Sequence, residues 1–264
     1  ARQGRAAAPR QQTETVGQSI VDLLDQGSQM GLRTLALSED KGGAGADALT
    51  SCIVTEELAA GDGDIAAVLT ETSRLAHVLF DQCMNDAQRD AFLPKFLGSD
   101  RYHLAFAGRE SGTDTRLGVN YYRPVSAEMV VKTTAAKSGN DWIISGIKDC
   151  VANAPVAGLF AVLVRIHGRP HTSVILVPAD ATGVSIKVEK NPWAHGVCGE
   201  VTFKDCKVPA ANLLGDDAAA RLRVGHTVFH HQRADGDAGV ERAIEADVAH
   251  CARIHPAPLA LQLS

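Results

Sequence analysis

The spacing of apolar residues along this chain changes twice, and these changes limit its fold more than any other feature. From Val16 to about residue 100, apolar side chains recur at helical spacing, as in "VGQSIVDLLDQ". Between residues 102 and 208 the apolar runs become short, rich in Val, Ile and Thr, and separated by turn residues. After Pro209 helical spacing returns. This order predicts an α+β fold class with segregated helices and strands.

The changes in period divide the chain into four regions. They are an irregular N-terminus (1–15), a helical domain (16–101), a β-sandwich or barrel domain (102–209) and a C-terminal helical segment (210–264). Gly61 and Gly63 are expected to split one helical run in two, and Asn85 or Asp86 to cap a later helix. We expect the β-domain to pack against the helices, with a ligand cleft between them.

Composition narrows the function classes. The net charge of −5 argues against nucleic acid as the main partner, and no apolar run is long enough to span a bilayer. The six cysteines form no Cys-x-x-Cys pair, which disfavours a zinc site or a disulfide framework and indicates a reducing compartment. The Arg- and Ala-rich start, "ARQGRAAAPRQQTE", is read as a frayed end or, alternatively, a transit peptide. We therefore expect a cytoplasmic protein, or a mitochondrial-matrix protein in a eukaryote.

Four motifs occur in an order that resembles one enzyme family. They are "LSEDKGGAGADALTSCIVTEEL", "NDAQRDAFLPKFLGSD", "NDWIISGIKDCVANAPVAGLFAVLVR" and "GEVTFKDCKVPAANLLGD". Together they are similar to the helical and β-domain motifs of the acyl-CoA dehydrogenases, over about residues 18–253. The Gly-Gly-x-Gly stretch at 42–45 belongs to the first motif and is read as a turn, since it does not fit a dinucleotide fingerprint.

This resemblance implies a flavoprotein. In the family, FAD lies between the β-domain and a C-terminal helical domain, a glutamate removes the α-proton of an acyl-CoA, and a hydride passes to the flavin. The protein contributes a water-poor slot, hydrogen bonds that polarise the thioester, and orientation of the cofactor.

The stretch "FAGRESGTD" (106–114) aligns with the family's "TEPxAGSD", which supplies a threonine and backbone amides to the flavin. Glu110 matches the glutamate, whereas Arg109 falls on the threonine, and two residues are missing after Ser111. The stretch from Lys148 to Asn153 aligns with "KxWITN", whose tryptophan and threonine contact the flavin. Here Cys150 replaces the aromatic residue and Ala152 replaces the hydroxyl residue.

The resemblance thus assigns cofactor binding to Phe106, Gly108, Arg109, Thr113, Cys150 and Ala152, and substrate binding to Gly112, Thr113 and Asp114. Because three side chains around one ring have changed, we expect FAD to bind weakly or not at all in the standard pose. Arg109 is expected either to meet an anionic flavin or CoA phosphate, or to pair with Glu110 or Asp114. Cys150 is read as a packing residue, with a catalytic thiol as the alternative.

No catalytic residue is identified from the sequence. The family's early glutamate should fall near Phe229 to His231, where no acid stands, and its late position would lie beyond this chain. His226 and His230 have a spacing that permits a metal on one helical face, but a third ligand is missing, so no metal site is predicted. Polar residues at a helix interface are the simpler interpretation.

Three functions remain open at this point. The first is an FAD-dependent acyl-CoA dehydrogenase that desaturates an acyl-CoA thioester. The second is a degenerate structural or CoA-binding subunit that partners an active paralogue, and the third is a flavin monooxygenase or oxidase on the same fold. In each case we expect a homo-oligomer or a hetero-oligomer. Whether this chain is an active enzyme, and for which acyl chain, the sequence does not decide.

Overall fold

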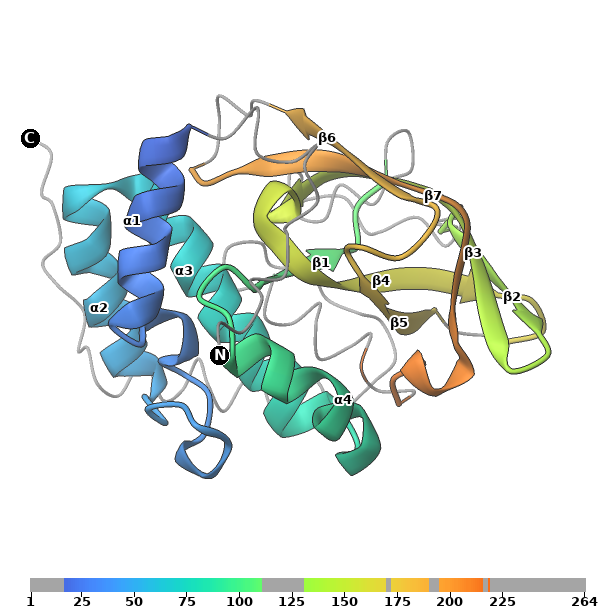
Figure 1. Ribbon diagram of the computed structural model, residues 1–264, viewed down its shortest axis with the longest axis horizontal. Coiled ribbons are helices and arrows are strands. Elements are labelled where there is room, and N and C mark those ends of the chain that lie inside the picture. The colour runs from blue at the N-terminus through green and yellow to red at the C-terminus, as the bar shows by residue number, and fades with distance from the viewer. Residues whose placement is uncertain (1–16, 111–130, 170–171, 190–194, 216–217, 219–264) are drawn as a thin grey trace, which may run out of the picture.

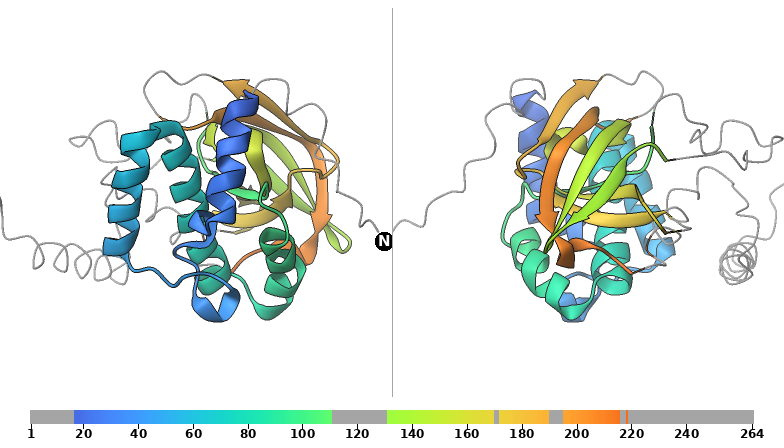
Figure 2. Two further views of the ribbon diagram at one scale, coloured as in Figure 1. Left: turned by 60° about the vertical axis from the view of Figure 1, so that its left-hand side comes forward. Right: turned by 90° about the vertical axis from the view of Figure 1, so that its right-hand side faces the viewer.

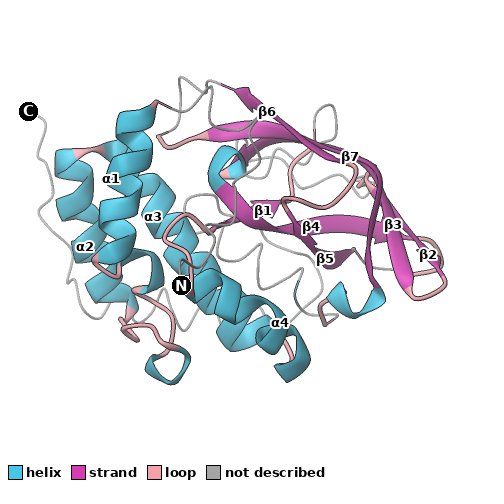
Figure 3. Cartoon of the chain, in the orientation of Figure 1, coloured by secondary structure: helices cyan, strands magenta, loops and turns pink. Residues whose placement is uncertain are grey.

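The computed structural model describes residues 17–110, 131–169, 172–189, 195–215 and 218. Helices gather on one side of the molecule and strands on the other (Figures 1 and 3). The α-helices are α1 (Gln18–Gln29), α2 (Ala48–Gly61), α3 (Gly63–Ala76) and α4 (Asp86–Leu97). The strands are β1 (His103–Ala107), β2 (Thr134–Ser138), β3 (Asp141–Ala152), β4 (Ala157–Ile166), β5 (Ser173–Pro178), β6 (Val184–Glu189) and β7 (Cys198–Pro209). The predicted α+β class is confirmed.

The helix boundaries follow local chemistry. Asp62 separates α2 from α3, and its side chain accepts hydrogen bonds from two amides at the start of α3. Asn85 caps α4 through a capping box with Gln88, as one of the two predicted caps. Gly31, after α1, adopts a φ of 81°, which a residue without Cβ reaches at little cost. The "KGGAGA" stretch forms a turn, as expected, with Gly45 N–H bonded to the Leu37 carbonyl at 2.8 Å.

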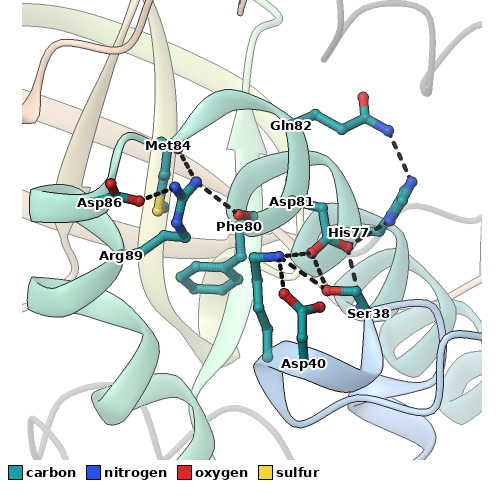
Figure 4. A network of polar contacts seen from close by, with 10 residues as sticks. Ser38, Asp40, His77, Phe80, Asp81, Gln82, Met84, Asp86 and Arg89 are labelled. Atoms are coloured by element: carbon teal, nitrogen blue, oxygen red, sulfur yellow. Dashed lines mark hydrogen bonds and ion pairs between the residues drawn. The ribbon is translucent and has the colours of Figure 1, made fainter.

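A π-helical turn (His77–Cys83) follows α3 directly, a feature that the apolar spacing did not predict. Polar contacts from residues before and after the turn stabilise it (Figure 4). The Asp81 carboxylate accepts from Ser38 Oγ at 2.6 Å and lies 2.7 Å from His77 Nδ1. Arg89 donates to a main-chain carbonyl within the turn at 3.3 Å. Burial raises the pKa of Asp81, but these hydrogen bonds outweigh burial, so the pKa lies below its ordinary value.

The strands form one curled, mixed sheet of seven strands in the order β1-β4-β2-β3-β7-β6, with β5 on β4. β4 pairs in parallel with β1 and β2, and the other pairings are antiparallel. Two views show the sheet curling beside the helices (Figure 2). The short strand β1 was not among the predicted strands, because its five residues are all buried and show no alternation.

Both faces of β1, β4 and β5 are buried, and alternate residues belong to different cores. Leu104, Phe106 and Leu159 pack in the cluster formed with α3, the π-helical turn and α4. Ala105 and Phe160 point the other way, into the cluster enclosed by the curled sheet. The predicted packing of the β-domain against the helices is therefore confirmed. Figure 1 shows α3 next to β1 at this junction.

The outer helix α2 is covered less than its apolar residues would lead one to expect. Ile53, Val54 and Leu58 recur at helical spacing, but no residue of α2 is buried and Ile53 is 52% exposed. Within the described residues, α2 packs mainly on α3, so only one of its sides is covered.

Candidate functional site

The residues after β1 and at the end of β3 bring the two predicted cofactor segments side by side, and we call this junction the cofactor edge. Asp149 N–H donates to the Arg109 carbonyl at 3.1 Å, which joins the two segments directly. Phe106 is buried in the core beside the helices. Its ring lies 2.7 Å from where a Cβ on Gly108 would stand, so packing against this ring already requires a glycine there.

A buried ion pair lies beneath this edge. Lys148 Nζ is 2.7 Å from Glu110 Oε1, and the two side chains are 0% and 2% exposed. The Glu110 carboxylate also accepts the main-chain amides of Lys132 at 2.6 Å and Thr133 at 2.9 Å. Burial raises the pKa of Glu110, but the charge of Lys148 and these hydrogen bonds together bring the pKa below its usual value. The carboxylate therefore stays ionised and links three segments of the β-domain.

Arg109 points outward from the same edge. Its Nε lies 3.1 Å from Asp149 Oδ1, and the two side chains are 52% and 17% exposed. From the sequence, Arg109 was expected to pair with Glu110 or Asp114 if it did not meet a ligand. In the structure Arg109 pairs with Asp149 and not with Glu110, and Asp114 lies outside the described residues. Glu110 faces inward because consecutive residues of an extended chain point to opposite sides.

A bulge in β3 sets the position of Cys150. Lys148 pairs with Val201 and Val151 with Gly199, so β3 has one residue more than β7 between these pairs. Cys150 takes a positive φ of 46° in this bulge, and its sulfur lies 3.9 Å from the sulfur of Cys198. Ala152 pairs with Cys198 and is half-buried. The predicted cofactor residues 150 and 152 therefore share one edge with 108 and 109.

Asn153 anchors this edge to the helical domain. Its φ of 63° is one that asparagine tolerates better than most residues. Its Nδ2 donates to the carbonyls of Val68 and Leu104, both at 3.1 Å, and to Thr72 Oγ1 at 3.2 Å. Thr72 Oγ1 also lies 3.2 Å from Nδ1 of the buried His103. These contacts join α3, β1 and the end of β3 at one point.

Sequence reasoning missed the positioning roles of Glu110, Lys148, Asn153 and Cys198. The first three occupy motif positions that were aligned without a role, so the motif was the available signal. Cys198 had no signal, because it lies 48 residues from Cys150. The predicted substrate residues Gly112, Thr113 and Asp114, and the histidines at 226, 230 and 231, lie outside the described residues.

Two hollows lie away from this edge. The first, of about 390 Å³, lies beside β2, where β3 begins and β4 ends, between Trp142 and Arg169. A second, of about 130 Å³, lies between α4 and Asn212. The predicted ligand cleft between the domains stays a prediction. Among the described residues, no three His, Cys, Asp or Glu side chains cluster as metal ligands, and no helix is both long and apolar enough to cross a membrane.

Comparison with known proteins covers both domains. Residues 4–100 match the family "Acyl-CoA dehydrogenase, N-terminal domain", and residues 125–206 match "Acyl-CoA dehydrogenase, middle domain". The short/branched chain specific acyl-CoA dehydrogenase of Bos taurus is 28% identical over 204 residues, covering 75% of this chain and 42% of that protein. The cyclohexane-1-carbonyl-CoA dehydrogenase of Geobacter metallireducens is 40% identical over 91 residues, covering 33% and 24%.

Solved structures agree with this assignment. An acyl-CoA dehydrogenase from Bacillus anthracis, complexed with FAD, has a TM-score of 0.64 at 26% identity, covering 80% of this chain and 35% of that one. A glutaryl-CoA dehydrogenase from Mycobacterium smegmatis has a TM-score of 0.63 at 20% identity, covering 77% and 50%, and supports the fold alone. The chain spans less than half the length of the curated relatives named here. Two matched domains in the family's order show that this chain belongs to the acyl-CoA dehydrogenase family.

Proposed function

We propose that this chain carries part of an FAD-dependent enzyme that desaturates an acyl-CoA thioester between its α and β carbons. The observation that carries the proposal is the set of buried contacts beneath the cofactor edge, which we call the frame: the Glu110–Lys148 ion pair and the hydrogen bonds of Asn153. The buried Glu110–Lys148 pair and the Asn153 anchor hold the two segments that the family uses for the flavin. Bound FAD would supply the hydride acceptor for this reaction.

The side chains at this edge fit a flavin poorly. The bulge takes Asp149 and Cys150 out of the β3–β7 register, and the Asp149 amide donates to the Arg109 carbonyl. Ala152 offers no hydroxyl, Cys150 no aromatic ring, and the Arg109 guanidinium is paired with Asp149. We therefore expect FAD to be held more weakly than in a protein with the family's side chains.

The described acids at this edge have positioning roles and are unsuited to act as the base. Glu110 is buried, ionised and paired with Lys148, and Asp149 is paired with Arg109. A base must reach the α-proton in a slot that excludes water, and a carboxylate already bonded to a lysine and two amides is a poor acceptor. The base is accordingly expected from residues outside those described.

The second candidate is a subunit that does not catalyse but binds CoA or a related active subunit. The changes at Arg109, Cys150 and Ala152 favour it, since all three fall around one ring of the ligand. In either case the protein is proposed to form a homo-oligomer or a hetero-oligomer. Its location is proposed to be the cytoplasm, or the mitochondrial matrix in a eukaryote, as the names of several relatives suggest.

An absorbance spectrum of the purified protein, with added FAD, tests both candidates. A flavin band that bleaches on anaerobic addition of acyl-CoA supports the dehydrogenase. Acyl-CoA binding by calorimetry without a flavin band supports the non-catalytic subunit. A flavin band that acyl-CoA leaves unchanged, together with no acyl-CoA binding, would contradict both.

A further inference from the structure

Cys150 and Cys198 form a pair of thiols that packing alone does not explain. Cys150 lies in the β3 bulge and Cys198 is the first residue of β7, and their sulfurs are 3.9 Å apart. Both side chains are half-buried, so they remain within reach of small molecules in solvent. Neither is needed to fill a core, because neither belongs to the clusters of buried residues.

The bulge is what brings the two sulfurs together. Cys198 pairs across the ladder with Ala152, so a regular strand would place residue 150 two positions further along. The extra residue and the positive φ at Cys150 redirect its side chain toward β7. A left-handed backbone at a non-glycine residue is unfavourable, and it occurs here at the residue whose sulfur contacts another thiol.

In the reduced protein the two thiols form a short chain of weak hydrogen bonds. Cys150 S–H donates to Cys198 Sγ, and Cys198 S–H donates to the Glu189 carbonyl at 3.5 Å. Burial, and then the neighbouring Cys150, raises the pKa of Cys198 to about 12, while Arg109 opposes this shift weakly. Cys198 therefore provides little thiolate at neutral pH, and the first attack on an oxidant falls to Cys150.

We infer that Cys150 and Cys198 are a reversible disulfide site, closed by exchange with a low-molecular-weight disulfide. The Cys150 thiolate attacks one sulfur of the oxidant, whose S–S bond breaks and releases one thiol, leaving a mixed disulfide on Cys150. Cys198 then gives up its proton and attacks Cys150 Sγ, which releases the second thiol. Two protein thiols lose two electrons, and the oxidant takes them up as two thiols.

Two other described cysteines, Cys206 and Cys52, lack this arrangement. Cys206 is fully buried in the core of the curled sheet, and burial raises its pKa to about 11. Cys52 is exposed on α2. Cys52 can therefore accept a glutathione but has no second thiol recorded beside it among the described residues, which makes it the matched control. This inference does not depend on flavin binding.

The test is to treat the reduced full chain with oxidised glutathione and then block remaining thiols. Intact mass and peptide mapping follow the products. We expect a linkage between the peptides that contain Cys150 and Cys198, loss of those two thiols from the alkylated set, and full recovery after reduction. A Cys52→Ser variant should form the same linkage.

The single variants distinguish exchange from direct modification. Cys198→Ser should keep one glutathione on Cys150, because no thiol resolves the mixed disulfide, and wild-type protein should not. The inference is overturned if Cys52 of the wild type becomes glutathionylated while 150 and 198 show no linkage. It is also overturned if wild type and Cys198→Ser retain glutathione on Cys150 equally. Because wild-type mapping decides the matter, poor folding of a variant leaves the test intact.

Discussion

Two neighbouring ion pairs connect the same two segments, yet they have opposite environments. Lys148–Glu110 is almost fully buried, whereas Arg109–Asp149, one residue away on each segment, reaches solvent. The inward residues match the family's lysine and glutamate, and the outward residues around the ligand edge have changed. The difference indicates that burial constrains the frame of the site more strongly than ligand binding constrains its surface in this chain.

The largest effect should come from breaking the buried pair. Lys148→Ala leaves the Glu110 carboxylate charged without its partner, so the free energy of unfolding should fall by about 3–5 kcal/mol. Urea denaturation measures this loss. As a control, the double variant Glu110→Gln with Lys148→Met should lose clearly less than Lys148→Ala, since no lone charge remains buried. Equal losses would show that packing volume, and not the charge pair, matters.

Acid should weaken the contact between β1 and α3 through His103. Burial, followed by the charge of Arg33, lowers the pKa of His103 to about 3 from its ordinary 6.5. Between pH 6.5 and 3 the unfolded chain therefore binds a proton at His103 that the folded chain does not. The contribution of His103 to stability is complete above pH 6.5 and falls as the pH drops toward 3. The loss from this group should be about 1.4 kcal/mol per pH unit in that window. His103→Gln should show a shallower pH dependence, and an unchanged slope would contradict the assignment.

A smaller loss is expected at Asn153. Asn153→Gly retains the positive φ but removes the hydrogen bonds to α3 and β1, which should cost about 2 kcal/mol of unfolding free energy. Asn153→Ala should cost about 1 kcal/mol more, because alanine is strained at this φ. Thermal and urea unfolding of both variants separate the two causes. The anchor would be unimportant if the glycine variant were as stable as the wild type.

The smallest effect should come from the exposed pair. Arg109→Ala removes an ion pair of which Arg109 is half exposed, so the loss should stay below about 1 kcal/mol. Raising the salt concentration should reduce even this difference. A loss as large as that of Lys148→Ala would break the distinction between inner frame and outer edge.

Much of the fold could be predicted because its signals are local. The period change near Tyr102, the glycines at 61 and 63, and the cap at Asn85 act over a few residues. The π-helical turn could not be predicted in this way. Asp81 holds it through Ser38, which is 43 residues away in sequence, and Arg89 holds it by bonding a main-chain carbonyl, which the sequence does not display. Strand β1 was not predicted either, because both its faces are buried and its sequence lacks the alternation of apolar and polar residues.

The candidate site was only partly predictable. Motif alignment found the segments at 106–110 and 148–153, and the structure brings them together. The alignment could not show that Arg109 turns outward to Asp149, because that choice depends on which residue of the pair faces the core. Nor could it find Cys198, whose closeness to Cys150 depends on a bulge that shifts the register of β3.

The central claim is that the buried Glu110–Lys148 pair is kept while the side chains that would contact the flavin, at 109, 150 and 152, are changed. An FAD titration tests this claim most directly. Fluorescence quenching of free FAD gives the Kd for the wild type and for Arg109→Thr combined with Cys150→Trp, with unfolding measured in parallel. We predict weak binding by the wild type and at least tenfold tighter binding by the double variant, a gain of about 1.4 kcal/mol. Tight wild-type binding that the two substitutions leave unchanged, in two equally stable proteins, would contradict the account.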